Sequence, residues 1–247
     1  MNLESEEKFF NDFAEIHGEY DVLGKRAYRK ILENFFKQVP VRSGDRIADL
    51  GCGSGAFTRR LSQATKAKVL GVDLSPGLIA AARQQSKGEE YRVGDITKTG
   101  LPEVSLDAIT YSGVLHHFPE AKQRVQVLSE GYRILCPGGS FFSFDPNWNS
   151  PSMWLYRDPA SPLRSRLGKT ESEVLLRRQQ IQQEATEAGF ISVRVFGVSG
   201  ITFRYVAGRF ARVFLPLYNL YERVMEKLPW EDRLGTFLVA CGTKGLK

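Results

Sequence analysis

The stretch Ile47-Ala48-Asp49-Leu50-Gly51-Cys52-Gly53-Ser54-Gly55 decides the fold of this chain of 247 residues. Its apolar first half is typical of a buried parallel strand. The three alternating glycines predict a sharp turn at which the backbone approaches a ligand closely. A helix is predicted over 56–65, so the turn leads into the free N–H groups of a helix N-terminus. A strand, a glycine turn and a helix in this order indicate a site for a nucleotide-type cofactor.

The composition is that of an ordinary globular protein, long enough for one large α/β domain. No apolar run of about 18 residues is present, so we expect no membrane-spanning helix. The glutamate-rich first residues do not resemble a signal peptide. The net charge of +6 fits either an anionic partner or a solvated surface. Scattered cysteines without disulfide or metal-ligand spacing predict a cytoplasmic protein; they are Cys52, Cys136 and Cys241.

Strand-like and helix-like segments alternate along the chain. The predicted strands are 46–49, 68–73, 91–95, 106–112, 140–145, 191–196 and 236–243. The predicted helices are two within 4–38, then 56–65, 75–87, 120–135, 171–189 and 203–228, the last kinked or split at Pro216. This alternation is typical of the α/β class, with a mostly parallel sheet and helices on both faces.

The glycine turn alone leaves the cofactor open. The spacing Gly51-x-Gly53-x-x-Ala56 also fits the alanine form of the dinucleotide fingerprint. Asp73 ends the second strand, and a carboxylate there can accept two hydrogen bonds from a ribose diol in either class of cofactor.

Five sequence blocks separate the classes. They are residues 49–55, 71–75, 94–96, 112–118 and 133–139. In this order and spacing they resemble the class I S-adenosylmethionine-dependent methyltransferases, in particular the small-molecule group with ubiquinone- and menaquinone-biosynthesis-type enzymes. The resemblance covers roughly residues 45–145.

The resemblance implies a Rossmann-like sheet of seven strands in the order 3-2-1-4-5-7-6, with strand seven antiparallel. It also implies N-terminal helices and a helical insert before the last strand. We expect one methyltransferase domain over 1–247. Its parts are an N-terminal helical lid (1–44), a cofactor-binding core (45–145) and cap or insert segments (146–170 and 199–229).

The resemblance further implies which residues bind the cofactor, S-adenosyl-L-methionine. They are Asp49, Gly51, Gly53, Gly55, Asp73, Leu74, Asp95, Ile96, Ser112 and Gly113. Asp49 would hold the methionine end, Asp73 the ribose diol and Asp95 the adenine amino group. The physical chemistry agrees, because this cofactor needs a diol acceptor and an adenine acceptor but no pyrophosphate site. The dinucleotide interpretation leaves Asp95 without a role.

Candidate catalytic residues follow the strands at the same edge of the sheet. Methyl transfer depends on positioning, and a hydroxyl or carbon acceptor also needs a base. His116 and His117 follow the fourth strand and are the candidate bases, although either could instead cap a helix or pack beside the cofactor. Candidate acceptor-binding residues are Tyr20, Asp145 and Asn147, of which the last two could equally only terminate a strand. We expect no metal site, because no metal-ligand spacing is visible.

The sequence therefore predicts a cytoplasmic enzyme that methylates oxygen or carbon of a small, partly apolar metabolite or lipid-linked precursor. Two alternatives remain. One is a non-catalytic S-adenosylmethionine-binding protein. The other is an RNA methyltransferase, disfavoured because no RNA-binding module is recognised. It rests on a basic cluster around the insert, made of Arg157, Arg164, Arg166, Lys169, Arg177 and Arg178.

Two apolar bands with flanking arginines mark residues 203–228. An ordinary core helix explains them, and so does a lid over an apolar acceptor. A peripheral membrane contact and a dimer contact are further options. The sequence thus leaves open whether the protein is a monomer or a homodimer.

Overall fold

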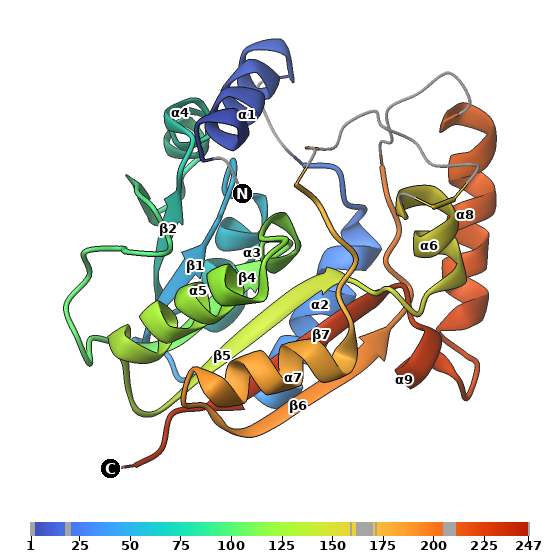
Figure 1. Ribbon diagram of the computed structural model, residues 1–247. Coiled ribbons are helices and arrows are strands. Elements are labelled where there is room, and N and C mark those ends of the chain that lie inside the picture. Colours follow the sequence, from blue (N-terminus) through green and yellow to red (C-terminus); the bar gives the residue numbers. More distant parts are fainter. Residues whose placement is uncertain are drawn as a thin grey trace.

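Seven strands of the computed structural model form one sheet in the order β3-β2-β1-β4-β5-β7-β6 (Figure 1). The structure describes residues 3–17, 21–158, 160–161, 170, 172–204 and 211–246. The strands are β1 (Arg46–Leu50), β2 (Lys68–Asp73), β3 (Glu90–Val93), β4 (Leu106–Ser112), β5 (Leu135–Pro146), β6 (Ile191–Val198) and β7 (Phe237–Thr243). β7 is antiparallel to β5 and β6, and the other pairs are parallel. The predicted strand order and reversed last strand are confirmed.

Helices connect the strands. They are α1 (Leu3–His17), α2 (Lys25–Gln38), α3 (Ala56–Thr65), α4 (Pro76–Gln84), α5 (Ala121–Ile134), α6 (Pro151–Arg157), α7 (Arg178–Glu187), α8 (Ala211–Met225) and α9 (Glu231–Leu234), with a short 3₁₀ turn η1 (Leu115–His117). The bounds of α3 agree with the prediction. α4 begins as the sequence indicates, with Ser75 as N-cap and Pro76 in the first turn.

Two apolar layers hold helices to opposite faces of the sheet. On one face, α5 and α7 pack through residues such as Val127 and Ile181. On the other face, α2 and α3 pack through Phe35 and Leu61. The central strands contribute buried side chains to both layers, as expected when both faces of a parallel sheet are covered.

The carboxyl ends of β1, β2 and β4 lie at one edge of the sheet because these strands are parallel neighbours. The glycine turn, Asp73 and Ser112 therefore meet there, although 61 residues separate the first glycine from Ser112. β5 also ends at this edge and brings Asp145 beside the turn after β4.

The predicted helix over 171–189 is wrong in its first third. α7 begins only at Arg178. The residues before it run extended, because they hydrogen-bond to other segments instead of to their own helix. Val174 N–H donates to the His116 carbonyl at 2.9 Å, and Leu176 N–H donates to the Pro146 carbonyl at 3.0 Å. This extended course carries Glu173 to the carboxyl edge of the sheet.

The sequence predicted that the helix is kinked or split at Pro216, and the split is wrong. α8 runs through this proline without interruption. Pro216 lies in the second turn, so its missing N–H leaves only one carbonyl near the helix start without its partner. Within the described residues, no helix is long and apolar enough to cross a membrane.

Candidate functional site

A cavity opens at the carboxyl edge of the sheet. Nine of the ten predicted cofactor residues line it, namely Asp49, Gly51, Gly53, Asp73, Leu74, Asp95, Ile96, Ser112 and Gly113. The tenth, Gly55, is not part of the lining and is the N-cap residue of α3. A Cβ at Gly55 would lie 2.5 Å from the hydroxyl of Tyr91, so this glycine allows close packing of the turn against β3.

The glycine turn shapes the floor of the cavity. Gly51 and Gly53 both have left-handed backbone, with φ of +78° and +54°. A Cβ at Gly51 would clash with Val114, whereas a Cβ at Gly53 would have no heavy atom within 4 Å. The backbone of Gly53 therefore faces open space, as a site for close approach of a ligand requires.

Two carboxylates are fixed beside this turn. Asp73 accepts hydrogen bonds from the N–H groups of Gly53 at 2.8 Å and Ser75 at 2.9 Å. Asp49 is fully buried and accepts from the hydroxyls of Thr58 at 2.6 Å and Thr110 at 2.7 Å. Burial raises the pKa of Asp49 to about 6 and also raises the pKa of Asp73. Burying these two carboxylates costs solvation free energy. A ligand that brings hydrogen-bond donors or positive charge to them would offset this cost.

The far end of the cavity is suited to a flat apolar ring. Leu74 and Ile96 line it together with Asp95. One carboxylate oxygen of Asp95, Oδ1, accepts the Thr97 N–H at 2.8 Å, which fixes the side chain. The residues of this end thus combine apolar walls with a carboxylate acceptor.

His116 is held by Asp145 at the other end of the cavity. Nδ1 of His116 lies 2.9 Å from Oδ1 of Asp145, which also accepts the His116 backbone N–H at 3.1 Å. Burial lowers the pKa of His116 well below its ordinary value and raises the pKa of Asp145 to about 7. The lowered pKa favours the neutral imidazole, and His116 lines the cavity.

His117 is held by a residue of α1. Its Nδ1 lies 3.2 Å from Oε2 of Glu6. Burial lowers the pKa of His117, but the hydrogen bond and charge of Glu6 and the charge of Glu173 outweigh burial and raise it. Burial alone would raise the pKa of Glu6, but the contacts with His117 and neighbouring hydroxyl groups outweigh burial, so the pKa of Glu6 is lowered. His117 and Glu6 therefore form an ion pair.

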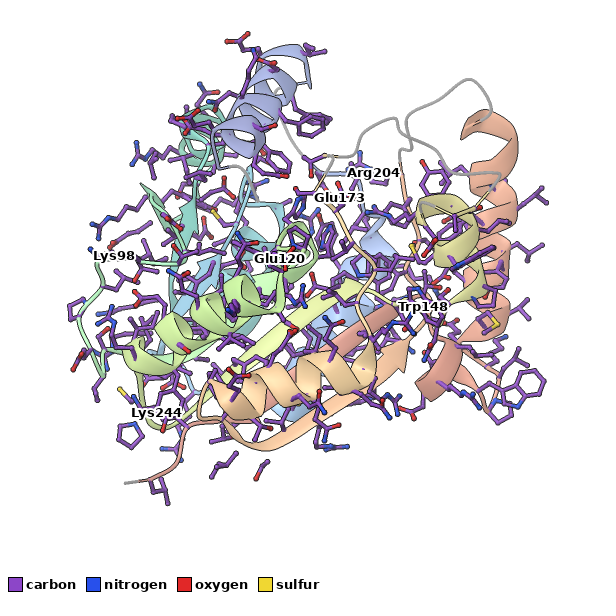
Figure 2. The ribbon with its side chains drawn as sticks, in the orientation of Figure 1. Lys98, Glu120, Trp148, Glu173, Arg204 and Lys244 are labelled. Carbon is purple, nitrogen blue, oxygen red and sulfur yellow. The ribbon has the colours of Figure 1, made fainter. Side chains whose placement is uncertain are left out.

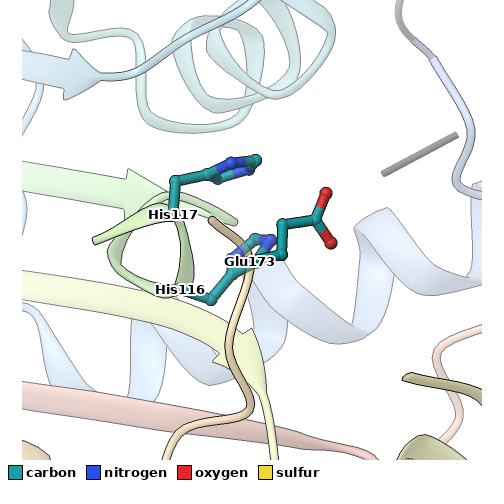
Figure 3. Close-up of side chains that lie close together, drawn as sticks. All are labelled: His116, His117 and Glu173. Carbon is teal, nitrogen blue, oxygen red and sulfur yellow. The ribbon is translucent and has the colours of Figure 1, made fainter. Parts of the chain in front are cut away.

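Glu173 completes a cluster with the two histidines. One potential ligand atom from each of His116, His117 and Glu173 lies within 4.8 Å of the others, and the three side chains converge (Figure 3). In Figure 2, Glu173 lies in the upper part of the view and Lys244 at the lower left. It forms an ion pair with Arg157 and accepts the Thr170 N–H at 3.1 Å. Since Arg157 and His117 already balance the carboxylates of Glu173 and Glu6, we interpret the cluster as a hydrogen-bonded charge network.

Aromatic side chains form the wall next to this network. Phe144 and Phe237 stack with ring centroids 4.4 Å apart, and Phe203 lies beside Phe237 at 6.3 Å. All three line the cavity, as does Phe10 of α1. The space beside His116 is therefore largely apolar, with charged groups at one side.

The predicted acceptor-binding residues have different positions. Asp145 is buried behind His116 and does not line the cavity. Asn147 is fully buried and donates to the Gly235 carbonyl at 2.6 Å, so its side chain ties β5 to the end of α9. Tyr20 lies outside the described residues. Of these predicted residues, the two that the structure describes, Asp145 and Asn147, therefore do not line the cavity.

Sequence reasoning did not find Thr58, Thr110, Glu6 or Glu173. The two threonines had a signal, because the strand register places Thr110 directly beside Asp49. Glu6 and Glu173 had none, because each meets His117 across more than fifty residues of sequence.

The three described members of the basic cluster around the insert make contacts within the molecule. Arg157 pairs with Glu173, and Arg178 pairs with Asp232 at 2.9 Å. The guanidinium of Arg177 lies 3.3 Å from the ring centre of Trp148. The other three members of the cluster, Arg164, Arg166 and Lys169, lie outside the described residues.

Comparisons with known proteins agree with this geometry. Residues 48–143 match a family model described as a methyltransferase domain. The malonyl-[acyl-carrier protein] O-methyltransferase of Serratia marcescens is 31% identical over 127 residues, covering 51% of this chain and 48% of that protein. A probable tRNA methyltransferase 9B of Bos taurus is 33% identical over 122 residues, covering 49% of this chain and 25% of that protein. The chain thus spans half or less of the length of these curated relatives.

Solved structures match over most of the chain. Phosphoethanolamine N-methyltransferase 2 of Haemonchus contortus, in complex with S-adenosyl-L-methionine, superimposes with a TM-score of 0.65 and 19% identity. The match covers 96% of this chain and 56% of that one, and at this identity it establishes the fold alone. The family match identifies residues 48–143 as a methyltransferase domain, and the strand order and glycine turn are those expected of the class I S-adenosylmethionine-dependent methyltransferase fold.

Proposed function

We propose that this protein transfers the methyl group of S-adenosyl-L-methionine to an oxygen or acidic carbon of a small, partly apolar acceptor. When bound, the cofactor supplies an electrophilic methyl group on a sulfonium. The single observation that carries the proposal is the His116–Asp145 pair, which places a neutral base in the cavity that the glycine turn and Asp73 also line.

The residues of the cavity fit this cofactor. Gly53 offers backbone with open space beside it, and Asp73 offers carboxylate oxygens near that backbone. Asp95, between Leu74 and Ile96, offers an acceptor within apolar walls. The Gly53 backbone would lie against the methionine and ribose part of the cofactor. Asp73 would bind the ribose diol, and Asp95 with its apolar neighbours would bind the adenine.

His116 is the proposed base. With Asp145 ionised, Nδ1–H of His116 donates to its Oδ1, and the lone pair of Nε2 is available to take a proton from the acceptor. The contact with Glu6 raises the pKa of His117 and so favours its protonated form, which has no lone pair to offer. The two histidines, equal candidates in sequence, thus have different proposed roles.

The acceptor that fits best has an apolar body and one ionisable group. The rings of Phe144, Phe203 and Phe237 would pack against the apolar body. Because these rings would exclude water, His116 would be the proton acceptor at the reacting atom. A lipid-linked precursor satisfies both requirements, and so does a small aromatic metabolite. The three cysteines are all unpaired, which supports the cytoplasm as the compartment.

The experiment is a labelled-methyl transfer screen. The purified chain is incubated with methyl-labelled S-adenosylmethionine and with metabolite extracts, lipid extracts and total RNA in separate reactions. Label in a small apolar product supports the proposal. Label only in RNA would instead support the alternative suggested by the tRNA methyltransferase relative. Tight cofactor binding in a calorimeter with no label in any pool would indicate a non-catalytic binding protein.

A further inference from the structure

The outer face of α8 carries apolar side chains that no described residue covers. Leu217, Leu220 and Val224 are 59%, 59% and 50% exposed, and they recur at the spacing of one helix face. Trp230, just beyond the helix, is also 59% exposed. We call these four residues the α8 apolar face. α8 lies at the margin of the molecule, beside α6 (Figure 1).

The opposite side of α8 is firmly attached to the core. Glu222 accepts the Ile201 N–H at 2.9 Å and also bonds to Thr236, and Met225 is buried. Tyr218 packs on Phe203, with ring centroids 5.5 Å apart. The inner side of the helix is therefore packed on the core, and the α8 apolar face lies on the side that no described residue covers.

The charges on this face are basic. Arg223 and Lys227 are exposed beside Val224. Between 215 and 230 no carboxylate is exposed, because Glu222 is buried and Glu226 pairs with Arg26. The next exposed carboxylate along the sequence, that of Asp232, pairs with Arg178. Long basic side chains around aliphatic groups and a tryptophan match the headgroup region of an anionic bilayer.

A second copy of the chain fits this face poorly. In a symmetric dimer each residue meets the same face of its partner. Arg223 and Lys227 would then approach their own copies, with no exposed carboxylate on the face to pair with them. An anionic surface has no such conflict.

We infer that α8 is a peripheral docking element that holds the protein on anionic phospholipid surfaces through the α8 apolar face, Arg223 and Lys227. The docking does not depend on the proposed reaction. The docking would serve the proposed reaction, however, because Phe203, which lines the cavity, packs on the inner side of the same helix. An apolar acceptor dissolved in the bilayer would then lie close to the site that methylates it.

Vesicle sedimentation with the full chain tests the inference. The chain should sediment with vesicles of phosphatidylcholine and phosphatidylglycerol and stay in solution with phosphatidylcholine alone. Leu220→Glu places a carboxylate in the apolar face and should lower the bound fraction at least about tenfold. Arg223→Gln and Lys227→Gln should each weaken binding about fivefold, and added salt should reduce the difference.

Leu246→Glu is the matched control, because Leu246 is 85% exposed near the C-terminus, far from α8 (Figure 1). It should bind vesicles like the unchanged chain. Leu220→Glu should keep its thermal unfolding temperature and its activity on a water-soluble acceptor. A failure of docking is therefore distinguishable from a failure of the proposed function.

Two results would overturn the inference. One is equal sedimentation of Leu220→Glu and the unchanged chain with anionic vesicles. The other is a dimer by light scattering that Leu220→Glu dissociates, without vesicle binding by the unchanged chain. That result would make the α8 apolar face a subunit interface.

Discussion

Oδ1 of Asp145 accepts the backbone N–H of His116 and lies 2.9 Å from its ring Nδ1, so the carboxylate in its ionised form fixes the ring with the proton on Nδ1. His116→Gln should lower the rate of methyl transfer roughly 10²–10⁴-fold, the usual contribution of a general base. Asp145→Asn should also lower the rate, because an amide can leave the imidazole in the wrong tautomer. Steady-state kinetics measure both. Calorimetry should find cofactor affinity unchanged, and a full rate in either variant would remove His116 as the base.

The same pair predicts a pH dependence of the rate. Burial raises the pKa of Asp145 to about 7. Below this pH the carboxyl is protonated and donates to Nδ1, which places the remaining N–H of the imidazole toward the cavity. Above it, Asp145 is ionised and Nε2 has its lone pair. The rate should therefore rise as the pH increases through about 7, and Asp145→Asn should lose this rise. A profile that is flat between pH 6 and 8 would contradict the assignment.

Asp73 should control cofactor affinity. Asp73→Asn removes the charge while keeping a side chain able to accept the Gly53 N–H. Binding of S-adenosylmethionine should weaken by about 1–3 kcal/mol, as for lost charge-assisted hydrogen bonds. The dissociation constant should therefore rise roughly 5- to 150-fold. Asp107→Asn is the control, because Asp107 lies near the start of β4, at the opposite edge of the sheet. Equal affinities of the two variants in a calorimeter would exclude Asp73 from the cofactor site.

The parts of the site that the sequence predicted follow from local patterns. Gly51, Gly53 and Asp73 follow strands whose parallel pairing could be inferred, and parallel pairing alone brings their ends together. Glu6 could not be found in this way, because the pattern of α1 marks only which side is buried. Glu173 was hidden by the helix predicted over 171–189, since its place depends on backbone bonds to β5 and η1.

The choice between the two histidines also lay beyond the sequence. His116 and His117 are adjacent and of one residue type, so no pattern separates them. Burial lowers the pKa of His116, whereas the contacts of His117 with Glu6 and Glu173 outweigh burial and raise its pKa. The sequence thus indicates which groups are present, whereas their surroundings in the fold determine which protonation state each one favours.

The ion pair between Glu6 of α1 and His117 should stabilise the fold only within a limited pH range. The raised pKa of His117 means that its contribution to folding is complete below about pH 6.5 and is lost as the pH rises through the raised value. The lowered pKa of Glu6 means that its contribution is present above about pH 4.5 and is lost as the pH falls through the lowered value. The pair should therefore stabilise the fold most between about pH 4.5 and 6.5.

Glu6→Gln tests this range. Urea unfolding should show the largest loss of stability relative to the unchanged chain between about pH 4.5 and 6.5, and a smaller loss at pH 9. In NMR titrations the pKa of His117 should fall in the variant, with His117→Gln used to assign the resonance. An unchanged His117 pKa would mean that Glu6 does not pair with it in solution.

A buried ion pair between α5 and α7 should control the stability of the fold. Arg124 is fully buried, and its guanidinium donates two hydrogen bonds to Glu184, at 2.6 and 2.8 Å. Arg124→Ala leaves the Glu184 carboxylate buried without its cation, so the free energy of unfolding should fall by about 3–5 kcal/mol. The double variant Arg124→Met with Glu184→Leu buries no charge and should recover much of this loss, because replacing both partners avoids the desolvation penalty. Urea unfolding of the three proteins measures the difference. If the double variant were less stable than Arg124→Ala, the pair would stabilise through more than avoided charge burial, and the hydrogen bonds from Arg124 to the Phe118 and Pro119 carbonyls would be the cause.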